Sequence, residues 1–234
     1  MQYLAVAFDY DGTLAHDGTV SSAVIAMLRK LKASGRRLIM VTGRHLEDLL
    51  RIFPESEMFD LLVVENGALL YNPQTREEKS LTEPANKDLI ELMAKVPVEP
   101  LVVGRCIIAT REPYHTQTLD AVQKLGLELQ VIFNKGAVMV LPSGVDKATG
   151  LMQALDELGL SPHNVVGAGD AENDHAFLSI CRMSVAPQNS LPSVKERVNY
   201  ITKKSHGDGM IEMIEQLLKD EFKSLSVEIR KESP

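Results

Sequence analysis

The chain has 234 residues, of which 44% are hydrophobic and 24% are charged, and its formal net charge is -7 at pH 7. These are values of a soluble globular protein, and they exclude a disordered or fibrous class. The negative charge argues against a general nucleic-acid-binding protein, which needs a basic surface, and the length suggests one core plus a smaller domain.

The cysteines and the apolar runs bear on the cellular setting. Cys106 and Cys181 are far apart and form no CxxC pair, so neither a disulfide scaffold nor a thiolate zinc site is indicated. The apolar run at residues 4–8 has no basic leader and ends at Asp9, so we do not expect a signal peptide. No run approaches the ~20 apolar residues of a membrane span. We therefore expect a cytoplasmic monomer or homodimer that binds neither membrane nor nucleic acid.

The first third of the chain alternates between strand and helix patterns. Short apolar runs at residues 3–8, 38–41 and 61–64 predict buried strands. Apolar residues at helical spacing predict a helix over 21–34, with Ser21 as its cap and Gly35 after its end, and another from Leu46 to the residues before Pro54. This alternation is typical of a doubly wound parallel sheet.

The pattern changes after Asn66 and Gly67. Strands are expected at 68–71, 106–109, 129–133 and 138–141, and helices at 86–95 and 116–125. Residues 134–136 form a tight loop between the last two strands, which predicts an antiparallel hairpin. These features indicate an inserted α+β domain.

Alternation then resumes. We expect a helix over 147–158, a strand over 165–168, a helix over 174–180, a strand over 183–186 and a docking helix through Ile211 to Phe222. The predicted fold class is α/β, a doubly wound, Rossmann-like parallel sheet with an inserted α+β cap. Its discontinuous core comprises residues 1–67 and 144–225, its cap residues 68–143, and residues 226–234 form a polar tail.

Two carboxylates at the end of the first strand carry the densest chemical signal. Asp9 and Asp11 project to the same side of an extended chain, and Gly12 allows the chain to turn away. Ligands bind at this edge of open α/β sheets. Two carboxylates that face one small volume repel each other, which favours either a divalent cation between them or the protonation of one of them. Such a pair suits a site in which one carboxylate is the nucleophile and the other is the acid or base. The alternative is that they only cap a loop.

Further acids follow a later strand. Asp170 ends the strand at 165–168 and Asp174 opens the next helix, so both should reach the same sheet edge as hard-oxygen ligands for Mg²⁺. Alternatively, Asp174 is only a charge favoured by the helix dipole. Asn173 could orient phosphate or a carboxylate, or could cap the helix.

The residues Thr42, Gly43 and Arg44 follow the second strand, where a hydroxyl, backbone N–H groups and a guanidinium suit an anion. Lys147 begins a helix, where the dipole disfavours a cation, so a nearby phosphate or carboxylate would offset the cost. Alternatively, Thr42 only caps the helix, Arg44 lies on the surface and Lys147 is solvated.

In order, the motifs DYDGT, TGR, a lysine after a long insert, and GDAEND resemble those of the haloacid dehalogenase phosphatase superfamily. The position of the insert, and Asn66-Gly67-Ala68 at its entrance, resemble the large-cap subgroup that includes Cof-type phosphatases, sucrose-phosphate phosphatase and archaeal phosphoglycolate phosphatase. One departure is Ala148, where a glycine commonly follows the lysine in such enzymes.

The resemblance implies a Mg²⁺-dependent phosphatase that hydrolyses a small phosphorylated metabolite, such as a sugar phosphate or a phosphoglycolate-like ester. It implies that Asp9 is the nucleophile and Asp11 the acid and base. It also implies roles for further residues: Mg²⁺ would be held by Asp9, Asp11, Asp170 and Asp174, and phosphate by Thr42, Gly43, Arg44, Lys147 and Asn173.

Two other functions stay open. Phosphomannomutase has similar motifs and a similar cap, so a phosphomutase is the enzyme alternative, which should exclude water better than a phosphatase. A non-catalytic phosphate-binding module is the other, although such a module has no reason to carry an inserted cap.

Overall fold

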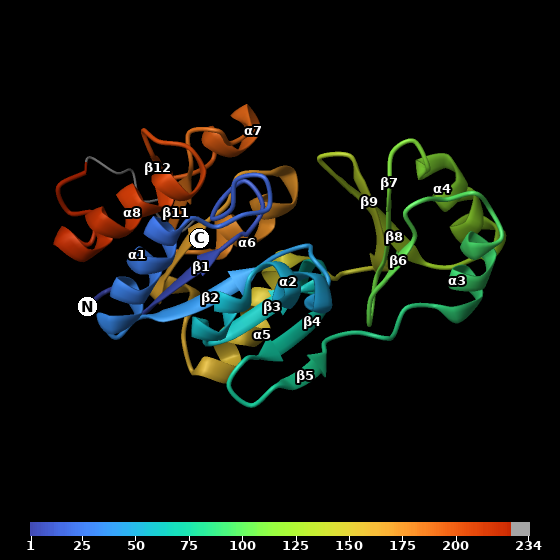
Figure 1. Ribbon diagram of the computed structural model, residues 1–234, viewed down its shortest axis with the longest axis horizontal. Helices are drawn as coiled ribbons and strands as arrows, with labels where there is room; N and C mark the ends of the chain where they lie inside the picture. The colour runs from blue at the N-terminus through green and yellow to red at the C-terminus, as the bar shows by residue number, and fades with distance from the viewer. Residues whose placement is uncertain (226–234) are drawn as a thin grey trace, which may run out of the picture.

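The computed structural model describes residues 1–225, so the polar tail predicted for residues 226–234 lies outside the described residues. The larger unit, on the left in Figure 1, is built on an eight-stranded sheet with the order β12-β11-β10-β1-β2-β3-β4-β5. The first six strands in this order are parallel. The bounds are β1 (Ala5–Phe8), β2 (Arg37–Val41), β3 (Leu61–Val64), β4 (Leu69–Asn72), β5 (Glu77–Ser80), β10 (Val165–Ala168), β11 (Met183–Ala186) and β12 (Tyr200–Ile201).

Helices cover both faces of this sheet. The side chains of β1 alternate between the two faces, so Val6 and Phe8 belong to the apolar cluster on one face and Ala5 and Ala7 to the cluster on the other. The first cluster also contains residues of α1 (Ser22–Ala33) and α8 (His206–Asp220), and the second contains residues of α5 (Lys147–Leu158) and α6 (His175–Ile180). The expected doubly wound sheet is therefore confirmed. Shorter helices are α2 (Leu46–Ile52) and α7 (Pro192–Lys195), with 3₁₀ turns η1 (Pro54–Met58), η2 (Glu65–Gly67), η3 (Pro162–Asn164) and η4 (Glu172–Asp174).

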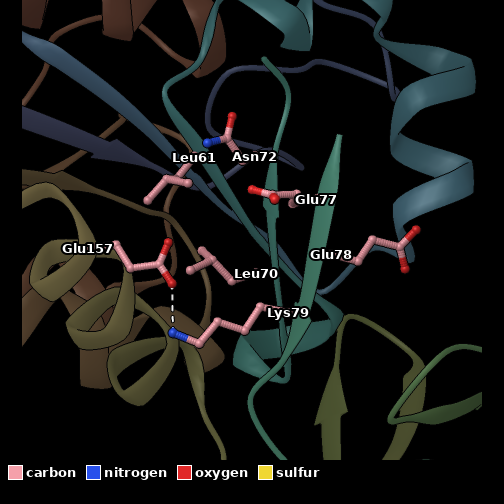
Figure 2. A pocket seen from close by; sticks show the side chains of 7 residues that line it. All are labelled: Leu61, Leu70, Asn72, Glu77, Glu78, Lys79 and Glu157. Carbon is pink, nitrogen blue, oxygen red and sulfur yellow. Dashed lines mark hydrogen bonds and ion pairs between the residues drawn. The ribbon is translucent and has the colours of Figure 1, made fainter. Parts of the chain in front are cut away.

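Strands β4 and β5 correct the sequence prediction. The strand expected at 68–71 was assigned to the insert, but β4 pairs antiparallel with β3 and so extends the core sheet. The second strand, β5, was not predicted because all four residues of its sequence EEKS are exposed and it has no apolar face. As an edge strand it is protected by charge. Figure 2 shows Lys79 of β5 reaching Glu157 of α5, with Nζ and Oε1 2.7 Å apart.

A smaller unit, on the right in Figure 1, contains a four-stranded antiparallel sheet with the order β6-β7-β9-β8. We call this sheet and its two helices the cap. Its elements are α3 (Lys87–Ala94), β6 (Val102–Val103), β7 (Ile108–Arg111), α4 (His115–Lys124), β8 (Leu129–Asn134) and β9 (Ala137–Pro142). The expected hairpin is confirmed by the pairing of β8 with β9, whereas the strand expected at 106–109 begins at Ile108. Leu89 and Met93 of α3 pack with Ile108 and Val140 on one face of the sheet.

The topology brings distant residues to one edge. Strand β1 lies between β2 and β10, and all three run parallel, so their carboxyl ends meet. Asp9, Thr42 and the Gly169-Asp170 dipeptide directly follow these ends. None of the helices within residues 1–225 is long and apolar enough to span a membrane.

Candidate active site

A buried lysine joins two carboxylates at the centre of this edge. Lys147 Nζ lies 2.6 Å from Asp9 Oδ1 and 2.6 Å from Asp174 Oδ1. The lysine side chain is 1% exposed, and the two carboxylates are similarly buried. An ammonium can be accommodated at such depth only when charged acceptors satisfy it. The predicted cation at the start of the helix is therefore paired with acids on two other segments of the chain.

The first turn of α5 holds Lys147 in place. Asp146 caps the helix by accepting a hydrogen bond from Thr149 N at 2.8 Å, and Thr149 Oγ1 accepts one from Asp146 N at 3.0 Å. A Cβ on Gly67 would lie 1.9 Å from the Asp146 carbonyl oxygen, and Gly67 has a φ of +103°. Glycine is therefore required at the turn between β3 and β4, because the backbone must approach the start of α5 closely.

Asp170 brings a third carboxylate to the cluster. One ligand oxygen from each of Asp9, Asp170 and Asp174 lies within 4.8 Å of the others, an arrangement that could hold a metal ion. Asp174 Oδ2 already accepts hydrogen bonds from Asp170 N at 2.8 Å and Ala171 N at 2.9 Å. Because Lys147 engages its other oxygen, Asp174 is better placed to fix the loop and the lysine than to ligate an ion directly.

The charges of the cluster are unbalanced. Burial and the neighbouring Asp174 carboxylate raise the pKa of Asp9 to about 8, although Lys147 opposes the shift. Burial raises the pKa of Asp170 as well, against the lowering effect of Lys135. Burial alone would lower the pKa of Lys147, but Asp174 and Asp9 outweigh it, so the pKa of Lys147 rises and the group stays charged. Three acids with hard oxygens and one buried ammonium fit a further cation such as Mg²⁺.

The residues after β2 lie on the other side of the site. Thr42 is 1% exposed, and its hydroxyl accepts a hydrogen bond from Arg44 N at 3.2 Å, which leaves its own proton available to an anion. A Cβ on Gly43 would lie 3.8 Å from Asn173 Nδ2 and 3.5 Å from Met139 Sδ. Asn173 donates to Asn66 Oδ1 at 3.1 Å, while its own Oδ1 is buried and has no hydrogen-bond partner among the described residues. Gly43 and Asn173 are thus neighbours, and Thr42 precedes Gly43 in the chain, so their binding of phosphate stays a prediction.

Arg44 is placed differently from the prediction. Its Nε and Nη2 donate to Asp11 Oδ2 and Oδ1 at 2.6 and 2.7 Å, and its Nη1 donates to Asp48 Oδ2 at 2.5 Å. The guanidinium also lies 5.3 Å from the centre of the Tyr10 ring. A bidentate pair of this kind fixes the position of a carboxylate. In this arrangement Arg44 therefore orients Asp11, and its binding of phosphate stays a prediction.

Three further residues at the site were not predicted. Lys135, at the tip of the β8–β9 hairpin, reaches Asp170 Oδ2 at 2.6 Å. Asn189 donates to the Gly12 carbonyl oxygen at 2.8 Å, and Thr13 donates to Asp170 Oδ1 at 3.5 Å. Thr13 could have been noticed as part of the DxDGT motif. A lone lysine in a hairpin turn and an asparagine after β11 carry no local signal of this kind.

The model for haloacid dehalogenase-like hydrolases matches residues 6–126 and 103–214. The chain belongs to the haloacid dehalogenase-like hydrolase family. The expected family and the expectation of a hydrolytic enzyme are thereby confirmed. The chain is 28% identical over 233 residues to phosphoglycolate phosphatase 2 of Saccharolobus solfataricus, covering 94% of each protein.

Solved structures of other family members share the fold. A haloacid dehalogenase-like hydrolase from Bacteroides thetaiotaomicron matches with a TM-score of 0.77 and 19% identity, covering 92% of this chain and 99% of that one. The sucrose-phosphatase from Synechocystis, solved with sucrose and phosphate, matches with a TM-score of 0.68 and 18% identity over 92% of this chain and 98% of its own. The Rossmann-like core with a cap is therefore the family architecture.

Proposed function

We propose that the chain is a Mg²⁺-dependent phosphatase that hydrolyses a small phosphate monoester through an aspartyl-phosphate intermediate. The observation that supports this proposal most strongly is the buried contact of Lys147 with Asp9 and Asp174, beside Asp170. It presents one carboxylate next to a fixed ammonium at the edge of the sheet, which suits a nucleophile that attacks an anionic centre.

Asp9 is the proposed nucleophile. Lys147 binds its Oδ1, and Oδ2 accepts no hydrogen bond from residues 1–225, so Oδ2 is the oxygen available to attack phosphorus. The new oxygen–phosphorus bond forms as the ester bond breaks, and the leaving alkoxide takes a proton. Lys147 and Thr42 would stabilise the negative charge that grows on the phosphoryl oxygens.

Asp11 is the proposed acid and base. It would protonate the leaving oxygen, then take a proton from the water that attacks phosphorus and releases Asp9 with inorganic phosphate. Arg44 now engages both of its oxygens. We infer that the Asp11 side chain turns from Arg44 toward Asp9 when substrate enters, and its 42% exposed side chain has room to do so.

Asp9, the Asp11 carbonyl and Asp170 would hold Mg²⁺, with Asp174 behind them. The ion would neutralise phosphate charge and favour the ionised form of Asp9. The three-carboxylate cluster and the raised pKa of Asp9, about 8, support this assignment. The phosphatase names of the relatives, phosphoglycolate phosphatase among them, support a small phosphorylated metabolite as the substrate.

The test is phosphate release from p-nitrophenyl phosphate and from 2-phosphoglycolate by the purified chain with Mg²⁺. We expect turnover that EDTA abolishes and Mg²⁺ restores, and that Ca²⁺ does not restore, because its larger and looser coordination misplaces the nucleophile. Asp9→Asn should abolish turnover while circular dichroism stays unchanged, and the exposed Asp17→Asn serves as the matched control. Full activity of Asp9→Asn, or full activity in EDTA, would refute the proposal.

A further inference from the structure

The tip of a cap hairpin reaches into the active site. Strands β8 and β9 pair up to Asn134 and Ala137, so the turn consists of Lys135 and Gly136 alone. Both have positive φ values, +47° and +83°, which is the geometry of a type I′ turn and matches the twist of the hairpin. A two-residue turn of this kind holds its side chain in a defined direction. The cap therefore presents Lys135 on a short, regular support.

The ammonium of Lys135 contacts core residues at the centre of the site. Its Nζ lies 2.6 Å from Asp170 Oδ2 and donates to the Asp11 carbonyl oxygen at 3.3 Å. A Cβ on Gly12 would lie 2.3 Å from Asp170 Oδ2 and 2.6 Å from this nitrogen, so the glycine leaves room for the ion pair between them. The lysine side chain is nevertheless 42% exposed. Asp170 and the Asp11 carbonyl are also proposed Mg²⁺ ligands, so a bound ion would displace the ammonium from them, and the partly exposed lysine would then turn toward the substrate.

The other cations near the site are already held. Lys147 is buried between Asp9 and Asp174, and Arg44 is held by Asp11 and Asp48. Arg105 of the cap pairs with glutamates outside the cluster. Within residues 1–225, Lys135 is thus the cap cation that forms an ion pair with the carboxylate cluster. A long, partly exposed lysine can turn toward an incoming anion at little cost.

Unpartnered polar atoms surround this position. Asn134 Oδ1, next to Lys135, is buried without a hydrogen-bond partner among the described residues, and so is Asn173 Oδ1. Strand β8 packs against η4, the turn that carries Asn173. Buried amide oxygens are normally satisfied, and a polar ligand between the cap and the core could donate a hydrogen bond to either of these two. Met139 of β9 lies near Gly43 and adds an apolar wall.

We propose that Lys135 is a specificity-determining residue that binds a carboxylate carried by the substrate on the side opposite its phosphate. The inference rests on the proposed function, because it takes the phosphoryl group to lie at Asp9, Lys147 and Thr42 on the core. A second anion on the same small molecule then meets the cap, where Lys135 supplies the positive charge. Because Lys135 reaches Asp170 at the edge of the carboxylate cluster, a substrate with only a short chain between its two anions fits best.

The experiment compares two esters of equal chain length, 2-phosphoglycolate and ethyl phosphate, which differ in the carboxylate. Lys135→Met keeps the length of the side chain and removes its charge. We expect kcat/KM for phosphoglycolate to fall by ~10- to 100-fold, mainly through KM, as the loss of a charge-assisted hydrogen bond predicts. The value for ethyl phosphate should change by less than about threefold. Lys135→Arg should recover part of the loss, and Lys124→Met on the outer helix α4 is the matched control.

Binding gives a readout that does not depend on turnover. Calorimetric titration of 2-phosphoglycolate into Asp9→Asn, with and without Lys135→Met, should show the same loss of affinity, and ethyl phosphate should show none. Equal losses for both esters, or no loss for phosphoglycolate, would overturn the role of Lys135. If the wild type releases phosphate from neither ester, the proposed function fails, and the titration alone decides the inference.

Discussion

Replacing Lys147 with methionine tests the central arrangement of the site. The substitution keeps the length of the side chain but leaves the buried carboxylates of Asp9 and Asp174 without the ammonium that lies 2.6 Å from each. Removing one partner of a buried ion pair costs about 3–5 kcal/mol. Lys147 also lowers the pKa of Asp9, so its loss should raise that pKa above about 8 and make the nucleophile harder to ionise. We expect a destabilised protein with at least ~10²-fold lower turnover.

The pH dependence identifies the cause of the destabilisation. Because Lys147 holds the pKa of Asp9 down to about 8, the Lys147→Met variant keeps Asp9 protonated over a wider range, so the loss of unfolding free energy should be larger at pH 9 than at pH 6. Urea unfolding in EDTA at both pH values measures this difference. The control is Lys79→Met, whose ammonium pairs with Glu157 on the surface and is 56% exposed, and it should cost at most about 1 kcal/mol. A loss below about 1 kcal/mol for Lys147→Met, or one independent of pH, would refute the reasoning.

Two further substitutions test the charges around the site. The folded-state pKa of Asp9, about 8, is raised above its ordinary value of 3.8, so folding binds a proton there and wild-type stability falls as pH rises between these values. Asp9→Asn should therefore gain stability over the wild type, by at most about 6 kcal/mol. Urea unfolding in EDTA should show a larger gain at pH 8 than at pH 5, and a constant gain contradicts the pKa shift. Glu65→Gln should lose about 1.5–3 kcal/mol of unfolding free energy. The fully buried carboxylate accepts hydrogen bonds from Arg105 N and Cys106 N, each at 2.9 Å, whereas the NH₂ group of a glutamine amide cannot accept either of them. Exposed Glu57→Gln is its control, and equal thermal unfolding of both variants contradicts this account.

The core elements were predictable because their local patterns agree with their burial. The helix expected over 147–158 and the strands expected over 165–168 and 183–186 have the same bounds as α5, β10 and β11. Each is a run of apolar residues with one clear period and a polar or glycine boundary. The exposed edge strand β5 and the two-residue strand β6 lack such a period, and both were missed. They exist because neighbouring strands offer them hydrogen bonds, which is tertiary information.

The same distinction applies to the site. Asp9 and Asp170 could be placed together from sequence, since the carboxyl ends of parallel strands share one edge of a sheet. Lys147 begins α5, which follows the cap strand β9, so only the family resemblance placed it there. The partner of Arg44 could not be predicted, because both phosphate and the nearby Asp11 satisfy a guanidinium equally well. Lys135 was missed because the docking of the cap on the core leaves no trace in the local pattern around residue 135.

The contacts between core and cap coincide with strained backbone. Glu65, Asn66 and Lys135 all have positive φ values, 52°, 56° and 47°, although none is glycine. Such conformations cost of order 1 kcal/mol or more each, and they persist only where surrounding contacts require them. Glu65 uses its conformation to meet the backbone N–H groups of the cap turn at Cys106, and Lys135 uses its own to reach Asp170. The cap is thus held over the site by one charged side chain from each side, Glu65 of the core and Lys135 of the cap, and both lie on strained turns. The docking of the cap therefore stabilises both the residue that anchors it, Glu65, and the residue that selects the substrate, Lys135.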